Sequence, residues 1–159
     1  MTAPEAGEVR IGDFFAAESR FWRDIYTGRD VYSRIQQYRK SLVLSWVDEL
    51  GLRPGSTVLE VGCGAGLTAV ALAQRGFRVH ATDGVPAMVE LAREQAAAAG
   101  VDDMLEVSLS DAQELGPDDN SFDLVVAIGL IPWLESPLTA LREMARVLAP
   151  GGTLIVSCD

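Results

Sequence analysis

From residue 57 onward, short apolar runs alternate with longer amphipathic stretches. The runs at 57–61, 77–82, 104–109, 122–128 and 153–157 have the length of strands and are mostly apolar, which is typical of strands buried on both faces. Between them, helical spacing predicts helices over 66–75, 86–99 and 137–148, with Pro86 and Pro137 in first turns. This order predicts an α/β fold, a doubly wound parallel sheet with helices on both faces.

Residues 1–50 show another pattern, in which aromatic residues are interleaved with arginines at helical spacing over 14–40. We therefore divide the chain into an N-terminal helical segment at 1–50 and a ligand-binding core at 51–159. Two interpretations of the helical segment stay open. Its helices either pack on the sheet with solvated arginines, or form a lid over the ligand that also contacts an anionic group of a substrate.

Composition limits the possible partners. The 159 residues include 13 basic and 23 acidic side chains, a net charge of −10, so nucleic acid is a poor partner. The N-terminus has neither a basic region nor a long apolar stretch, which argues against a signal peptide and a membrane span. The two cysteines, Cys63 and Cys158, indicate no disulfide framework, and we expect a cytoplasmic protein.

An acidic residue and three alternate glycines follow the first predicted strand: Glu60, Gly62, Gly64 and Gly66. Glycine allows the sharp turn from strand to helix and lets a ligand lie against the backbone. The dinucleotide fingerprint G-x-G-x-x-G requires glycine where this chain has Leu67, and a carboxylate beside the loop suits a cationic ligand better than a pyrophosphate. The pattern therefore predicts a cofactor loop and argues against a nicotinamide-dependent reductase.

Residues 58–66 resemble the first motif of the class I S-adenosylmethionine-dependent methyltransferases. Further segments resemble this family in the expected order, at 81–84, 110–112, 120–127 and 143–152, so that the resemblance covers 57–157. The chain is most similar to the small-molecule type that includes quinone-biosynthesis enzymes. The resemblance implies a Rossmann-like methyltransferase core, S-adenosyl-L-methionine as cofactor and a small-molecule acceptor.

The resemblance also implies the cofactor contacts. Asp83 would accept hydrogen bonds from the ribose hydroxyls, with a helix cap as its alternative role. Asp111 would bind the adenine amino group, while Met88 would pack on the adenine ring or belong to the core. The predicted cofactor-binding residues are Glu60, Gly62, Cys63, Gly64, Gly66, Asp83, Gly84, Met88, Asp111, Ala112 and Ile128.

No general base is visible after the fourth predicted strand, where many members of the family carry a histidine. Methyl transfer requires mainly in-line positioning, so this pattern is compatible with an enzyme. His80 lies inside a strand and is predicted to be structural. Cys63 is either an activated thiol or a small residue tolerated between glycines, and Trp133 either a substrate wall or a cap on the core. No metal-ligand cluster is present in the sequence pattern.

In the resembled family the fifth strand is followed by further elements, including an antiparallel strand pair. The sequence ends at Asp159, so we expect a core that is incomplete at its C-terminus, with an open edge on the fifth strand. The predicted function is methyl transfer to a small organic acceptor by in-line displacement. The alternatives are a nicotinamide-dependent reductase and a non-catalytic binding module with the same fold, and the sequence does not indicate an oligomeric state.

Overall fold

The computed structural model describes residues 11–25 and 27–158. Residues 1–10 of the predicted helical segment therefore lie outside the described part of the chain. The elements in chain order are α1 (Ile11–Ala17), α2 (Ser19–Asp24), α3 (Val31–Glu49), β1 (Thr57–Val61), α4 (Leu67–Ala73), β2 (Arg78–Asp83), α5 (Pro86–Ala99), β3 (Leu105–Leu109), β4 (Phe122–Ala127), the 3-10 helix η1 (Ile131–Trp133), α6 (Pro137–Val147) and β5 (Leu148–Val156).

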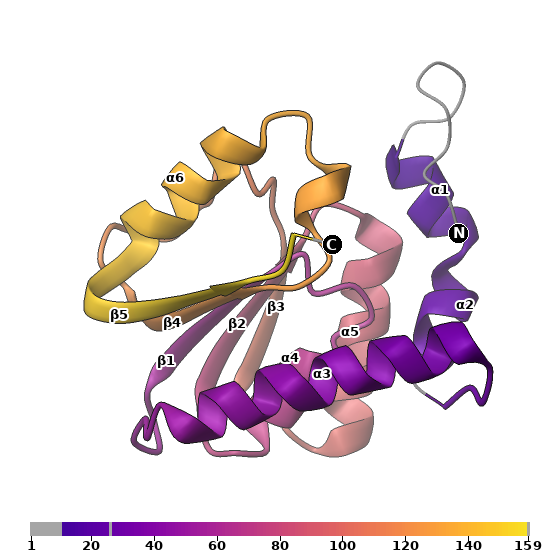
Figure 1. The fold of residues 1–159 in the computed structure, drawn as a ribbon, viewed down its shortest axis with the longest axis horizontal. Coiled ribbons are helices and arrows are strands. Elements are labelled where there is room, and N and C mark those ends of the chain that lie inside the picture. Colours follow the sequence, from indigo (N-terminus) through magenta and orange to yellow (C-terminus); the bar gives the residue numbers. More distant parts are fainter. Residues whose placement is uncertain (1–10, 26, 159) are drawn as a thin grey trace.

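The five strands form one parallel sheet in the order β3-β2-β1-β4-β5. Strand β1 pairs with β2 on one side and with β4 on the other, so the strand order reverses at β1 (Figure 1). Ligands of such sheets bind beyond the carboxyl ends of the strands at this reversal. The predicted doubly wound α/β fold is confirmed, and its strand order indicates the ends of β1 and β4 as the candidate site.

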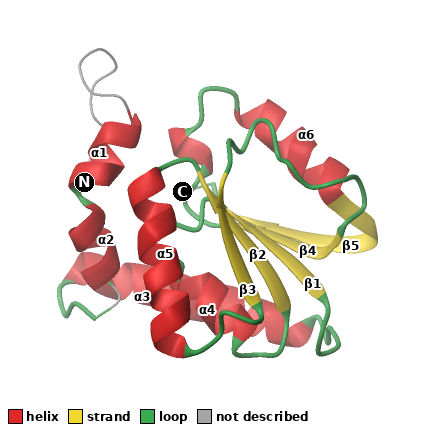
Figure 2. Ribbon diagram, turned by 180° about the vertical axis from the view of Figure 1, so that it is seen from behind, coloured by secondary structure: helices red, strands yellow, loops and turns green. Residues whose placement is uncertain are grey.

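Helices cover both faces of the sheet (Figures 1 and 2). Val58 of β1 belongs to a core cluster shared with α3, α4 and α5, whereas the next residue, Leu59, belongs to a second cluster shared with α6. Successive side chains of a strand point to opposite faces, which explains why both are buried. The burial of β1 on two sides fixes the register of the strand that leads into the glycine loop.

The three N-terminal helices pack against two different parts of the molecule. Helix α3 packs on the sheet, because Val43 and Val47 are buried in the cluster that contains α4 and α5. Its first turn is capped by Asp30, whose carboxylate accepts a hydrogen bond from the backbone N–H of Ser33. Helices α1 and α2 contact α5 instead. They lie beside α5 in Figure 2, away from the sheet.

Two elements differ from their predicted bounds by more than one residue at one end. Helix α4 is shorter than 66–75, since Gly66 has a left-handed backbone with φ 78° and precedes the helix. Strand β5 already begins at Leu148, although the sequence predicted a strand only at 153–157. Leu148 pairs with Phe122 before the register shifts, and Gly151 has φ 79°, so a turn-like bulge interrupts a longer strand.

Strand β3 forms one edge of the sheet. Arg93 of α5 reaches this edge, where its Nε and Nη2 donate to the Val107 carbonyl oxygen at 3.2 and 3.0 Å. Its Nη1 forms an ion pair with Glu90 on the same helix at 2.8 Å. The side chain therefore links α5 to the outer side of β3, in addition to the apolar contacts between the two elements.

Candidate functional site

A cavity of about 980 Å³ lies at the carboxyl ends of the strands. The glycine loop after β1, the end of β2, the start of α5 and the loops after β3 and β4 form one side of it. All predicted cofactor-binding residues except Gly66 line this cavity: Glu60, Gly62, Cys63, Gly64, Asp83, Gly84, Met88, Asp111, Ala112 and Ile128. Residues that were singled out from four separate segments thus meet around one space.

The glycine loop is tied to the end of β2. The backbone N–H groups of Gly62 and Cys63 both donate to the Thr82 carbonyl, at 2.8 and 2.9 Å. Gly62 has φ 73°, and a Cβ at this position would lie 2.8 Å from Cδ1 of Leu130. Gly64 has φ 52° and no neighbouring atom within 4 Å of such a Cβ, so its open side faces the cavity.

Gly66 has a different environment. A Cβ at this position would lie 2.7 Å from Cβ and 2.9 Å from Cα of Ala92. The close approach of α5 to the start of α4 therefore requires glycine here. Because Gly66 does not line the cavity, its place in the structure is that of a packing residue beneath the cofactor loop.

Asp83 connects the loop to the end of β2. Its Oδ2 accepts a hydrogen bond from the Gly64 N–H at 2.8 Å, and its Oδ1 accepts one from the Val85 N–H at 2.9 Å. Burial raises the pKa of this carboxyl group, while the backbone donors act in the opposite direction. Val85 itself precedes α5, so Asp83 does not cap the first turn of that helix. A carboxylate offers about four lone-pair sites, which leaves acceptor positions for a ligand.

Glu60 is buried at 4% exposure, and its Oε2 has no hydrogen-bond partner among the described residues. Burial raises its pKa to about 8. A hydrogen bond with the Ala69 backbone and the charge of Lys40 lower this pKa, but by less than burial raises it. Lys40 of α3 lines the same cavity, and burial lowers the pKa of its ammonium group. The sequence did not indicate Lys40, because its electrostatic interaction with Glu60 joins two elements that are distant in the chain. Glu60 is therefore a buried acid that a cationic ligand would ionise.

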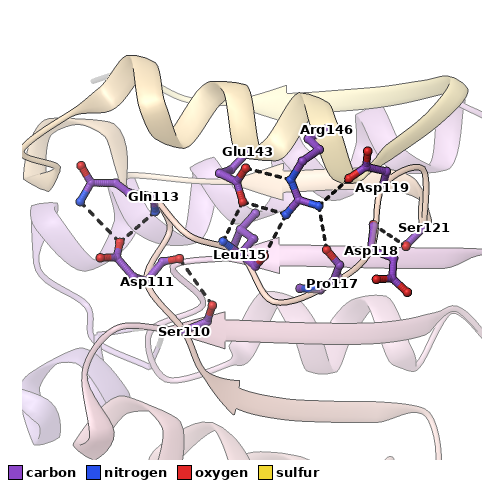
Figure 3. Close-up of polar contacts among 10 residues, drawn as sticks. All are labelled: Ser110, Asp111, Gln113, Leu115, Pro117, Asp118, Asp119, Ser121, Glu143 and Arg146. Atoms are coloured by element: carbon purple, nitrogen blue, oxygen red, sulfur yellow. Dashed lines mark hydrogen bonds and ion pairs between the residues drawn. The ribbon is translucent and has the colours of Figure 1, made fainter.

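Asp111 lies in the loop that leaves β3 (Figure 3). Its Oδ1 accepts a hydrogen bond from the Gln113 N–H at 2.8 Å, which closes a local turn. The neighbouring Ala112 is buried and belongs to the core cluster under α6. The turn thus holds one residue in the core and presents an exposed carboxylate at the cavity.

Arg146 of α6 holds the remainder of this loop (Figure 3). Its guanidinium group donates to the carbonyl oxygens of Leu115 and Pro117 at 2.8 and 3.0 Å, and to Asp119 at 2.8 Å. Glu143 accepts two further bonds from it, at 2.8 and 2.7 Å, and one from the Leu115 N–H at 2.9 Å. The Arg146 hydrogen bond is the main cause of a lowered pKa at Glu143. This network orders the segment behind Asp111.

We expect Arg146→Met to loosen the loop that carries Asp111, because five hydrogen bonds to four residues are lost. Hydrogen exchange of residues 110–119 should accelerate. Affinity for an adenosyl ligand should fall roughly threefold to tenfold, since binding would then have to order the loop. Arg142→Met on the exposed side of the same helix is the matched control. Equal exchange in the two variants would contradict the role of the network.

The other side of the cavity consists of residues from α1, α2, α3 and the segment around η1. Four aromatic rings line it: those of Phe15, Trp22, Tyr32 and Trp133. Trp133 therefore forms part of the cavity wall, and η1 contributes no buried residue to the core. The interleaved aromatic residues of the N-terminal segment were the sequence signal for this wall, but their common orientation follows only from the fold.

His80 and Cys63 are not candidates for catalysis. His80 lies outside the cavity, where its Nε2 is 2.7 Å from Oγ of Ser108, and burial lowers its pKa. Cys63 lines the cavity, yet burial, aided by the charges of Glu60 and Asp83, raises its pKa. The direction of this shift is opposite to that of an activated thiol and favours the interpretation of Cys63 as a small residue tolerated between glycines.

The described part of the chain has neither a metal-ligand cluster nor a membrane-spanning helix. Over residues 11–25 and 27–158, no group of three or more His, Cys, Asp or Glu side chains could hold a metal ion. Over the same ranges, no helix has both the length and the apolar character needed to span a membrane.

A family described as "Methyltransferase domain" matches residues 59–156. The ubiquinone biosynthesis O-methyltransferase of Xanthomonas campestris pv. campestris is 32% identical over 146 residues, which cover 91% of this chain and 59% of that protein. The methyltransferase GfsG of Streptomyces halstedii is 29% identical over 163 residues, which cover 96% of this chain and 59% of that protein. The chain thus spans about 59% of the length of these relatives.

Two solved structures share the fold of this chain. The [4+2]-cyclase SpnF has a TM-score of 0.80 at 25% identity, covering 92% of this chain and 58% of SpnF. A SAM-dependent methyltransferase from Aquifex aeolicus has a TM-score of 0.68 at 31% identity, covering 84% of this chain and 70% of that one. The region that matches the family, residues 59–156, includes the glycine loop and the ends of the strands that surround the cavity.

Proposed function

The chain belongs to the methyltransferase domain family, and from this we propose that it transfers a methyl group from S-adenosyl-L-methionine to a small organic acceptor by in-line displacement. One observation carries the proposal. Three carboxylates from successive strand ends, those of Glu60, Asp83 and Asp111, line one cavity beside the glycine loop. They match the ammonium group, the ribose hydroxyls and the adenine amino group of this cofactor.

The remaining lining residues fit the rest of the cofactor. Met88 and Ile128 supply apolar surface for the adenine ring. Arg39 lines the cavity from α3, and its Nη1 lies 3.8 Å from the place of a Cβ on Gly129, the residue after Ile128. A guanidinium group at this position suits the carboxylate of the methionine part. Gln36, which accepts a hydrogen bond from Arg39 at 3.2 Å, keeps that side chain in place.

When bound, the cofactor supplies a methyl group that its sulfonium has already activated. The protein contributes position and the exclusion of water, which together can lower a barrier by about 7 to 11 kcal/mol. Among the described residues that line the cavity there is no histidine. We propose that α1 and α2, which carry part of the aromatic wall, close over the two ligands as a lid.

Binding of S-adenosylhomocysteine at pH 7 should release roughly one proton per molecule. In the free protein Glu60 has a pKa of about 8, so it is mostly protonated at pH 7. The ligand ammonium group favours the ionised carboxylate and lowers this pKa. Affinity should accordingly rise as the pH increases toward 8. Calorimetric titration in buffers of different ionisation enthalpy measures the release, which Glu60→Gln should abolish.

Asp83→Ala should weaken binding of S-adenosylmethionine by about 2 to 4 kcal/mol, because two ribose hydroxyls lose a charged acceptor. The variant also loses the two hydrogen bonds that fix Gly64 and Val85. Asp83→Asn retains a carbonyl oxygen and should lose less. Isothermal titration gives the affinities, and a wild-type affinity in the alanine variant would exclude Asp83 from the site.

The proposed function is tested by two measurements on the same protein. Isothermal titration with S-adenosylhomocysteine should show saturable binding, and NADH should not compete with it. Transfer of a labelled methyl group to a panel of small hydroxyl and amino compounds should then follow in single turnover. Absence of cofactor binding would refute the proposal, and binding without transfer would favour the non-catalytic module.

We further propose a cytoplasmic location. The two cysteines support it, since Cys63 and Cys158 are both free in the structure and form no disulfide with each other. A cell fractionation that located the protein in an oxidising compartment would contradict this.

A further inference from the structure

Apolar side chains gather on the outer face of α3. Of the eight large apolar side chains that are exposed in the described part of the chain, five lie on this helix or on its C-cap residue, and their exposure ranges from 39 to 76%. Together with the half-buried Leu42 they recur every three or four residues, the spacing of one helix face. They form what is here called the outer stripe: Val31, Ile35, Tyr38, Leu42, Trp46 and Leu50.

The outer stripe is separate from the face that attaches α3 to the core. The buried residues of the helix are Ser33, Gln36, Val43 and Val47, which at 3.6 residues per turn point to a different side. In Figure 1, α3 lies in front of α4, and no other element lies in front of α3. Single exposed apolar residues are common, but a continuous row of them marks an interaction surface.

We propose that the outer stripe is a dimer interface, in which α3 pairs with α3 of a second copy of this chain in antiparallel orientation. The inference does not rest on the proposed function. Ile35 also lines the cavity, whereas the other five members of the stripe do not.

The stripe is complementary to itself. A two-fold axis near residue 40 would place its members opposite one another in three apolar pairs: Val31 with Leu50, Ile35 with Trp46 and Tyr38 with Leu42. A two-fold dimer requires this property, because the same surface serves both copies. Specific interfaces bury upwards of about 1,000 Å² in total, and aromatic side chains such as Tyr38 and Trp46 can supply about 150 to 250 Å² each. One helix pair therefore predicts a weak dimer.

The charges beside the stripe favour antiparallel pairing. Arg34 near the start of α3 and Glu49 at its end are both exposed and lie on the same flank of the stripe. Among the residues that the structure describes, neither side chain has an ion-pair partner within the chain. In an antiparallel pair, Arg34 of one copy lies near Glu49 of the other, twice per dimer. A parallel pair would bring like charges together instead.

The dipole of α3 supports the same orientation. A cation near the N-terminus of a helix and an anion at its C-terminus are both unfavourable, and Arg34 and Glu49 occupy these positions. An antiparallel neighbour brings the positive end of its own helix to Glu49, which offsets this cost. A membrane is a poorer occupant of the stripe, since the net charge of −10 would be repelled by anionic lipids.

Sedimentation equilibrium of the full chain tests the interface. Between about 1 and 500 µM, in reducing buffer because Cys158 is exposed and free, we expect a dimer with a dissociation constant of about 1 to 100 µM. Tyr38→Glu should weaken it at least about thirtyfold, since a charge would enter an apolar interface near the axis. Leu138→Glu on α6 is the matched control, with 59% exposure against 67% for Tyr38, and should leave the constant unchanged.

Charge reversal tests the orientation. Arg34→Glu and Glu49→Arg should each weaken the dimer about tenfold, and the double variant should return to within about threefold of the wild type. Net charge alone predicts otherwise, because Glu49→Arg brings the protein closer to neutrality and would then strengthen the dimer.

Four results would overturn the inference. These are a wild type that stays monomeric over the whole range, a dimer that survives Tyr38→Glu, equal losses in Tyr38→Glu and Leu138→Glu, and a double variant no better than the two single ones. A monomer that binds phosphatidylcholine vesicles, with Tyr38→Glu unable to do so, would assign the stripe to a lipid surface instead.

Discussion

Gly64→Val should abolish cofactor binding while the fold persists. Gly64 lies in the glycine loop with its open side toward the cavity, so a branched side chain would occupy the space of the ligand. A loss of roughly a hundredfold or more in affinity is expected, which corresponds to about 3 kcal/mol. The backbone also has φ 52°, which a β-branched residue adopts only with strain. Isothermal titration with S-adenosylhomocysteine measures the affinity, and circular dichroism monitors the fold.

The chain offers a control for the strain in this variant. Gly100 has φ 65° and, like Gly64, no atom within 4 Å of an added Cβ, but it follows α5 outside the cavity. Gly100→Val should therefore suffer a similar backbone penalty, about 1 to 2 kcal/mol, and bind the ligand normally. If Gly64→Val also binds normally, the loop has only a structural role.

Gly66→Val should have the opposite phenotype, a large loss of stability. The added Cβ would lie 2.7 Å from Cβ of Ala92, and α5 would have to move away from the start of α4. Overpacking typically costs about 1 to 3 kcal/mol, and the left-handed backbone adds about 1 to 2 kcal/mol, so the free energy of unfolding should fall by roughly 2 to 5 kcal/mol. Urea denaturation provides this value from the shift of the midpoint.

The cause of this loss can be isolated with a smaller substitution. Gly66→Ala adds only the Cβ that would lie too close to Ala92. Combining it with Ala92→Gly removes the methyl group that this Cβ would meet. The double variant should recover part of the stability lost in Gly66→Ala, beyond the sum of the single effects. Additive effects, or a Gly66→Val variant as stable as Gly100→Val, would show that the contact with α5 does not restrict this position.

The sequence predicted the sheet and most of its boundaries for a physical reason. Strands buried on both faces appear as apolar runs, and the side of β1 that holds Val58 and the side that holds Leu59 are both enclosed. The acidic residues at strand ends could be placed together because parallel strands bring their carboxyl ends to one edge of the sheet. This reasoning located Asp83 and Asp111, which do line the same cavity. Their cofactor contacts remain predictions.

Contacts between distant elements could not be predicted in this way. Lys40 approaches Glu60 only because α3 packs across the sheet, and Arg146 reaches Asp119 only because α6 lies over the loop before β4. Gly66 has the same residue type and spacing as the two cavity-lining glycines, so its contact with Ala92 has no local signal. Side-chain partners of this kind depend on the packing of helices, which one sequence pattern does not specify.

The side chain of Arg93 protects the β3 edge against unwanted pairing. An incoming strand from another molecule would need the outward carbonyl of Val107, which already accepts two hydrogen bonds from this guanidinium group. A charged side chain on an edge strand is a common barrier to strand addition and to aggregation. Arg93 therefore occupies one of the outward acceptors of this edge, so that the obstacle to strand addition comes here from a helix residue and not from the strand itself.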